Sequence, residues 1–181
     1  MLKITVPANE YYDELKNEFI STKEQTLVLE HSLVSISKWE SKWEEPFLVD
    51  KKKSPEQMAD YIRCMTLTQN VDPNIYGSMT EKNIEDITNY INAKQTATTI
   101  KELPGQIRRG NEIITSEIIY YWMIALQIPV EFQKWHLNRL ITLIRVCNIK
   151  NAPPKKMSRR ETINSNRALN EARRKAHNTK G

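Results

Sequence analysis

A single proline divides the most apolar part of this chain. Residues 111–148 contain two apolar runs, one after the other, and Pro129 lies between them. Proline lacks an amide hydrogen and disfavours helical backbone in the residue before it, but it fits well at the first position of a helix. The sequence therefore predicts two helices, broken near residues 127–129, that form the nucleus of the fold.

The two predicted helices differ in their apolar patterns. In the first, apolar side chains cover most of the circumference, which is typical of a helix packed on several sides. In the second, apolar residues recur along one side, and these are Phe132, Trp135, Leu140, Ile141 and Ile144. We therefore expect a core helix followed by an amphipathic helix.

Short strands are predicted near the N-terminus. Alternating apolar and polar residues indicate strands at residues 2–6, 18–21 and 26–30, with a turn at residues 22–25. An alternative interpretation places a helix over residues 11–20, because the aromatic residues and the leucine there also fit helical spacing.

Helix-start signals follow these strands. Ser32, Ser54 and Thr80 each precede an apolar pattern of helical period, and serine and threonine are favoured caps of helix N-termini. The first of these helices is expected to end before Pro46, and residues 93–111 are expected to form the longest loop. The predicted fold class is α+β and mainly α, with short N-terminal strands followed by a helical domain.

The charge of the chain is unevenly distributed. Residues 150–181 hold ten Lys and Arg against two Glu, a net charge of +8, whereas residues 1–149 hold 17 basic against 20 acidic residues, a net charge of −3. We therefore predict a single globular domain over residues 1–149, with a short β segment at 2–31 and helices from 32 onward. A basic linker and C-terminal arm are predicted over residues 150–181.

The basic arm is expected to contain a helix from residue 159 to about residue 176, because Ser158 and Glu161 have the spacing of a capping box. Its positive side chains suit phosphates or an acidic protein surface, and they are Lys155, Lys156, Arg159, Arg160, Arg167, Arg173, Arg174 and Lys175. The arm has no Phe, Tyr or Trp to stack on bases. A solvated or protein-docking arm and a sequence-independent contact with nucleic acid therefore both remain open.

Residues that usually carry catalysis or bind metals are few and scattered. His31 and His136 lack a partner at the helical spacing of a metal site, and the sequence has no Gly-rich phosphate loop and no nucleophile elbow. Cys64 and Cys147 lie in apolar helical patterns and are expected to be buried thiols. A thiol served by His136 is the minor alternative. We expect no cofactor, no metal and no enzymatic activity.

Two tryptophans stand out in the first predicted helix. Trp39 and Trp43 are four residues apart in a segment rich in Ser, Lys and Glu, so both indoles lie on the same side. They either pack in the core or form an exposed aromatic ridge that binds a partner protein, because Trp is frequent at interface hot spots.

Three blocks of the sequence carry a family resemblance. Residues 29–47, 114–129 and 132–161 read LEHSLVSISKWESKWEEPF, ITSEIIYYWMIALQIP and FQKWHLNRLITLIRVCNIKNAPPKKMSRRE. Together they resemble a family of small proteins encoded in the structural-gene modules of tailed bacteriophages. The resemblance implies a role in virion assembly and transfers no catalytic motif.

The resemblance also implies particular partners. Tail-assembly chaperones of tailed phages bind the long, helical tape-measure protein until the tail tube polymerises around it, and they are absent from finished particles. We therefore expect a non-enzymatic, tail-assembly-chaperone-like protein that binds other phage structural proteins. We expect it in the host cytoplasm, because the sequence shows no signal peptide and no apolar run long enough to span a membrane. The alternative is a permanent capsid, neck or tail component of the virion whose basic arm contacts neighbouring subunits or packaged DNA.

Overall fold

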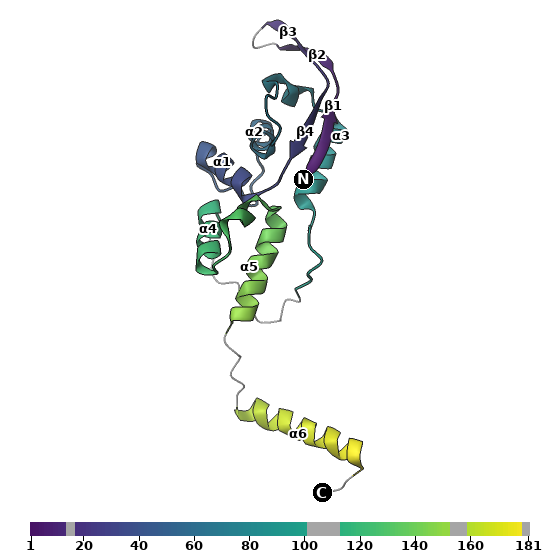
Figure 1. Ribbon diagram of the computed structural model, residues 1–181, viewed down its shortest axis with the longest axis vertical. Helices are drawn as coiled ribbons and strands as arrows, with labels where there is room; N and C mark the ends of the chain where they lie inside the picture. The colour runs from purple at the N-terminus through teal and green to yellow at the C-terminus, as the bar shows by residue number, and fades with distance from the viewer. Residues whose placement is uncertain (14–16, 101–112, 153–158, 179–181) are drawn as a thin grey trace. The chain divides into compact units, whose positions relative to one another are not determined.

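The computed structural model of the chain describes residues 1–13, 17–100, 113–152 and 159–178. It divides into two compact units, Met1–Ile149 and Lys150–Gly181. Helices dominate the first unit and follow four short strands, which confirms the predicted fold class (Figure 1).

The four strands form two antiparallel pairs. Strand β1 (Leu2–Val6) pairs with β4 (Gln25–Leu29), and β2 (Asn9–Asp13) pairs with β3 (Glu18–Thr22). The three predicted strands are present, and the alternative helix over residues 11–20 is wrong because β2 and β3 form a hairpin there. Strand β2 was not predicted, because its two tyrosines fit a strand as well as they fit a helix.

Three helices and a short 3₁₀ helix follow the strands. Helix α1 (Leu33–Trp43), helix α2 (Pro55–Met65) and helix α3 (Glu81–Asn92) begin where the caps predicted, and η1 (Pro73–Ser78) precedes α3. The side chains of Ser32, Ser54 and Thr80 each accept a hydrogen bond from the backbone three residues on, and each takes part in a reciprocal capping box. Local sequence signals therefore set these helix starts.

The segment around Pro129 departs from the prediction. Helix α4 (Ser116–Ala125) is followed by the 3₁₀ helix η2 (Val130–Lys134), and α5 (Leu137–Asn151) begins only at Leu137. Pro129 therefore opens a short 3₁₀ turn and not the second long helix. The chain is redirected because the Leu137 amide donates a hydrogen bond of 2.8 Å to the carbonyl of His31, which holds the start of α5 against the junction between β4 and α1.

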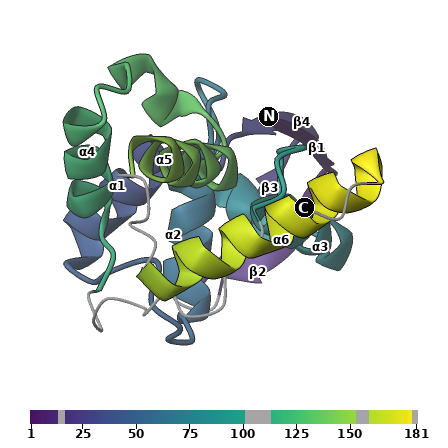
Figure 2. The same cartoon turned by 90° about the horizontal axis from the view of Figure 1, so that it is seen from below.

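The apolar stripe of α5 is correspondingly shorter than predicted. Leu137, Leu140 and Ile144 form its buried side. Phe132 and Trp135 lie before the helix and stack on each other, with ring centroids 4.1 Å apart. Figure 2 looks along α5 and shows α1 and α4 on one side of it and α3 on the other.

One core extends through the first unit. The buried side of the β1–β4 pair, α1, α2, α3, α4 and the start of α5 all contribute to it. Its largest fully buried side chains include Leu27, Leu33, Trp39, Tyr61, Met65, Ile87, Ile119 and Leu137. Burying a side chain of this kind stabilises a fold by about 1.5–3 kcal/mol, so this core determines how the peripheral elements are placed.

A buried carboxylate joins α1 to α4. Glu40 is 7% exposed, and its two oxygens accept hydrogen bonds from the amide of Phe47 at 2.8 Å and from the amide of Ser116 at 2.7 Å. Ser116 is the first residue of α4, where amides have no partner within the helix and a negative charge is favourable. Glu40 therefore fixes both the turn after α1 and the N-terminus of α4.

We expect Glu40→Gln to lower the free energy of unfolding by about 1–3 kcal/mol, because a carboxamide has only one accepting oxygen and leaves one buried amide without its partner. Urea denaturation followed by circular dichroism measures the change. The matched control is Glu44→Gln, since Glu44 is exposed at the end of the same helix. Equal stabilities of the two variants would contradict this role of Glu40.

Candidate functional site

The outward face of α4 is the first candidate interaction site. Tyr121 is 66% exposed and Ile124 is 77% exposed, whereas Ile119 and Met123 on the other side of the helix are buried. Tyr121 and Ile124 are three residues apart and therefore fall along one side of the helix. We call Tyr121 and Ile124 the α4 face.

The α4 face corrects the prediction of a helix packed on several sides. Sequence periodicity could not separate the two sides of α4, because both are apolar. In the structure only one apolar side of α4, that of Ile119 and Met123, is buried against the core. Exposed apolar residues gathered on one side of a helix are typical of a protein–protein contact.

Contacts to η2 hold the region beside α4 in place. The hydroxyl of Tyr120 donates a hydrogen bond of 2.9 Å to Oε1 of Gln133. The guanidinium carbon of Arg139 lies 3.9 Å from the ring centroid of Trp135, which is itself stacked on Phe132. The side chains of Phe132 and Trp135 are half-buried, and that of Arg139 is exposed.

Trp39 and Trp43, for which either core packing or partner binding was predicted, differ in how deeply they are buried. Trp39 is 1% exposed, packs edge-on against Phe47 and donates a hydrogen bond of 2.9 Å from Nε1 to the carbonyl of Gln57. Trp43 is half-buried and donates a hydrogen bond of 3.0 Å to Asp60. Trp39 is therefore a core residue, and partner binding through Trp43 stays a prediction.

A cluster of polar side chains lies inside the first unit. A hydrogen bond of 2.5 Å joins Nδ1 of His31 to the Tyr61 hydroxyl, and the rings of His31 and His136 are 5.1 Å apart. The Tyr90 hydroxyl donates a hydrogen bond of 2.7 Å to Oε1 of Glu30. The cluster connects the junction of β4 and α1 with α2, α3 and the start of α5.

The hydrogen bonds of His136 hold its imidazole in one neutral tautomer. Its Nδ1 accepts a hydrogen bond of 3.3 Å from the Asn138 amide, so the proton resides on Nε2, which donates to the Tyr90 carbonyl at 3.0 Å. Both ring nitrogens are thus engaged, and burial lowers the pKa of His136. This geometry leaves no free nitrogen to activate a thiol, and burial raises the pKa of Cys64.

Two further observations concern ligands and membranes. No group of three or more His, Cys, Asp or Glu among the described residues is arranged to hold a metal ion. Within the same residues, no helix combines the length and the apolar composition that crossing a bilayer requires.

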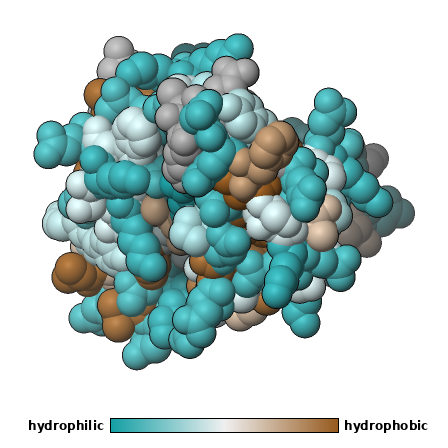
Figure 3. Space-filling view, turned by 90° about the horizontal axis from the view of Figure 1, so that it is seen from above, coloured by the Kyte–Doolittle hydropathy of each residue, from teal (hydrophilic) through white to brown (hydrophobic). Residues whose placement is uncertain are grey.

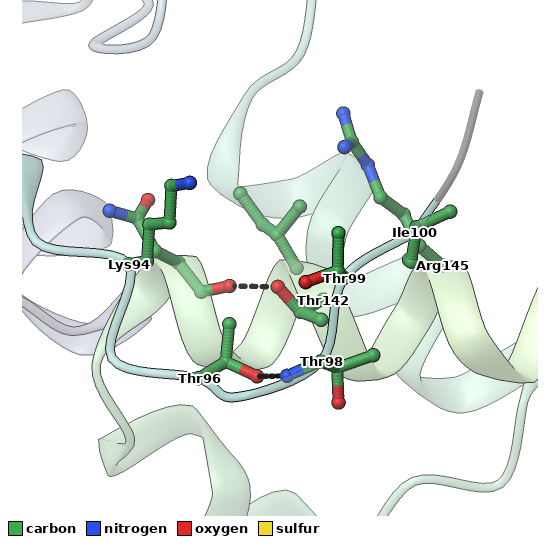
Figure 4. Close-up of a pocket in the computed structure, with 9 residues that line it drawn as sticks. Lys94, Thr96, Thr98, Thr99, Ile100, Thr142 and Arg145 are labelled. Atoms are coloured by element: carbon green, nitrogen blue, oxygen red, sulfur yellow. Dashed lines mark hydrogen bonds between the residues drawn. The ribbon is translucent and has the colours of Figure 1, made fainter.

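A polar cleft of about 470 Å³ lies between residues 94–100 and α5 (Figure 4). Lys94 and Arg145 stand at its sides, with threonine side chains between them. Asn138 closes its inner side by donating hydrogen bonds to the carbonyls of Ile91 and Ala93. Its described lining offers positive charge and hydroxyl groups but no acidic or nucleophilic pair.

The basic arm contains helix α6 (Arg159–His177). Six of the predicted basic residues lie on it, namely Arg159, Arg160, Arg167, Arg173, Arg174 and Lys175, whereas Lys155 and Lys156 fall outside the described residues. Arg160, Arg167 and Arg174 recur every seven residues and therefore share one side of α6. Neither a base-stacking aromatic ring nor a metal ligand set accompanies them on α6.

The chain was compared with models of known protein families, with curated proteins and with solved structures, and none of the three comparisons finds a match.

The buried histidines predict a pH-dependent stability. Burial, and then the neighbouring His136, lower the pKa of His31 from 6.5 to about 3. Between these two values the unfolded chain binds a proton at His31 that the folded chain does not bind, so stability is full above pH 6.5 and falls as the pH is lowered. The loss at pH 5 relative to pH 7.5 should be about 2 kcal/mol for this group.

Urea denaturation of the wild type and of His31→Gln at both pH values tests this expectation. The variant should lose less stability on acidification than the wild type, although Glu30 and the Met1 amino group also face the cluster. His177→Gln is the matched control, because His177 is exposed on α6. An identical pH dependence in the wild type and His31→Gln would show that His31 is not held neutral.

Proposed function

We propose that this chain is a non-enzymatic assembly protein of tailed bacteriophages, similar to a tail-assembly chaperone, that binds other phage structural proteins in the host cytoplasm. The observation that carries the proposal is the α4 face. An assembly chaperone must offer an apolar surface to a helical client, and Tyr121 and Ile124 offer one on a helix anchored by Glu40. The three blocks that resemble phage structural-module proteins support the same class.

The chemistry of the α4 face suits an amphipathic helix as client. Such helices bind through apolar residues three, four and seven positions apart, and tyrosine is a frequent anchor in interfaces because it is large and loses little conformational freedom. A tape-measure protein is long and helical, so it presents many such stretches.

The alternative is a permanent capsid, neck or tail component whose basic arm contacts neighbouring subunits or packaged DNA. The observation that favours this alternative is the positive charge of α6, which carries six Arg and Lys residues and only two Glu residues. An arginine-rich helix binds phosphates by releasing counterions, and this binding is independent of sequence.

Co-purification with a tape-measure fragment tests the chaperone proposal. The double variant Tyr121→Ser/Ile124→Ser should capture at least tenfold less fragment than the wild type, because truncating interface anchors typically costs more than 1 kcal/mol each. Leu67→Ser is the control, since Leu67 is exposed on another part of the unit. Capture that is unaffected by the α4 variants, or equally reduced by the control, would argue against the α4 face.

The alternative makes a separate prediction for nucleic acid. Binding of a DNA duplex, measured by fluorescence anisotropy, should weaken steeply between 50 and 200 mM salt, as phosphate contacts require. It should disappear when residues 150–181 are removed, because this region carries the +8 charge. An unchanged affinity of the truncated chain would reject the arm as the DNA contact.

A further inference from the structure

The polar cleft beside α5 is positively charged, although the first unit as a whole is negative. The two segments that form the cleft, residues 93–100 and 137–149, contain three basic residues and no acidic one, which is a net charge of +3. Residues 1–149 together have a net charge of −3. A concave surface with charge of one sign concentrates ions of the opposite sign, so the cleft favours an anion.

Two of these basic residues, Lys94 and Arg145, have no counterion among the described residues. The ion pairs within the part of the chain that the structure describes involve Glu30, Glu45 and Asp60, and none includes Lys94 or Arg145. Both side chains are exposed and stand on opposite sides of the cleft (Figure 4). An anion that lies between them is therefore attracted by two charges.

Threonine hydroxyls lie between the two cations. The Thr142 hydroxyl donates a hydrogen bond of 2.8 Å to the carbonyl of Asn138, so its hydrogen is used within α5. In Figure 4 the Thr99 hydroxyl points toward Thr142, whereas the Thr98 hydroxyl points away from it. No hydrogen bond within the described residues uses the Thr99 hydroxyl, which leaves it available to donate to a ligand.

The loop that forms one side of the cleft is held in place. Nδ2 of Asn138 donates hydrogen bonds to the carbonyls of Ile91 and Ala93, at 3.1 and 2.9 Å. Within the loop, the Thr98 amide donates a hydrogen bond of 3.2 Å to the Thr96 hydroxyl. Groups that are positioned before binding lose less conformational freedom when a ligand binds.

The cleft also has an apolar part. Ile100 and Ile141 are half-buried and line it. On the face of the molecule that Figure 3 shows, hydrophobic side chains form separate brown spots among hydrophilic teal ones, which is ordinary for a protein surface. In the cleft, by contrast, the two isoleucines lie in a hollow beside two positive charges. A ligand with both an anionic and an apolar part suits this arrangement.

The charge and the volume of the cleft indicate the ligand class. A phosphate monoester has a charge of about −2 at pH 7 and three acceptor oxygens, so it matches Lys94, Arg145 and Thr99 together. A carboxylate or a phosphodiester has a single charge. The cleft volume of about 470 Å³ lies within the range of about 300–1,000 Å³ of small-molecule sites, and a bare phosphate ion fills only part of it.

We propose that this cleft binds a phosphate monoester. The phosphate lies between Lys94 and Arg145 and accepts a hydrogen bond from Thr99, and the organic group packs on Ile100 and Ile141. The same chemical group is found on a free nucleotide and at the phosphorylated end of a nucleic-acid strand. The described lining includes no residue of the α4 face, so this binding goes beyond the assembly role and does not depend on it.

Isothermal titration calorimetry of the full chain tests the proposal after nuclease treatment, with adenosine monophosphate as the probe. The wild type should bind adenosine monophosphate but not adenosine. Cyclic adenosine monophosphate, a diester with one charge, and inorganic phosphate, which has no organic group, should each bind about tenfold more weakly.

The variant Lys94→Gln/Arg145→Gln should bind adenosine monophosphate at least about tenfold more weakly than the wild type, because both charged partners are lost. The matched control is Arg167→Gln/Arg174→Gln, which removes the same number of charges from exposed positions of α6 and should bind like the wild type. Circular dichroism spectra should be unchanged, because all four side chains are exposed.

A second pair of variants tests the hydroxyl without changing charge. Thr99→Val keeps the size of the side chain and removes its donor, so the affinity for adenosine monophosphate should fall about tenfold. Thr98→Val is the control on the neighbouring residue, whose hydroxyl points away, and it should have no effect.

Oligonucleotides with and without a terminal phosphate separate the two sources of the monoester, when they are added to the α6 control variant. Tighter binding of the phosphorylated strand supports the proposal with a strand end as ligand, and binding of adenosine monophosphate alone supports it with a free ester. A wild type that binds neither probe, or binding that survives in Lys94→Gln/Arg145→Gln, would overturn the proposal. Either result would leave the capture of a tape-measure fragment to be judged by its own measurement.

Discussion

The two hydrogen bonds that Glu40 accepts fix the turn after α1 and the N-terminus of α4 against the shared core. A carboxylate buried beside an apolar core is stable only when amide donors surround it. The amides of Phe47 and Ser116 supply those donors, so the turn after α1 and the first turn of α4 are positioned by one side chain. The buried side of α4 then packs on α1, and its other apolar side is left at the surface.

A second polar group performs the same task at the start of α5. The cluster around His31 and His136 joins elements that are far apart in the sequence, and the Leu137 amide closes it by donating to the His31 carbonyl. Nearly every polar atom in it is engaged in holding the fold. The surfaces on which the proposed functions rest are peripheral, and they are the α4 face and the basic helix α6.

Much of this fold could be read from local sequence signals, and the errors have physical causes. Caps such as Ser54 and Thr80 act within three residues, so the starts of α2 and α3 were predictable. The face of α4 was not, because both of its sides are apolar and only tertiary packing decides which is covered. The hydrogen bond between Glu40 and Ser116 joins residues 76 positions apart, and such pairings leave no local pattern. The position of Trp39 could not be predicted either, because its spacing from Trp43 is compatible with a buried or an exposed side chain. In the structure Trp39 is buried in the core.

The central claim is that the chain assists phage assembly by transient contacts through surfaces mounted on a fixed core. Quantitative mass spectrometry of purified virions tests this claim most directly, because it separates a transient from a permanent role without knowledge of the partner. We expect the protein to be abundant in infected-cell lysate during assembly and absent from finished particles. A fixed number of copies in every virion would contradict it and would favour a structural component.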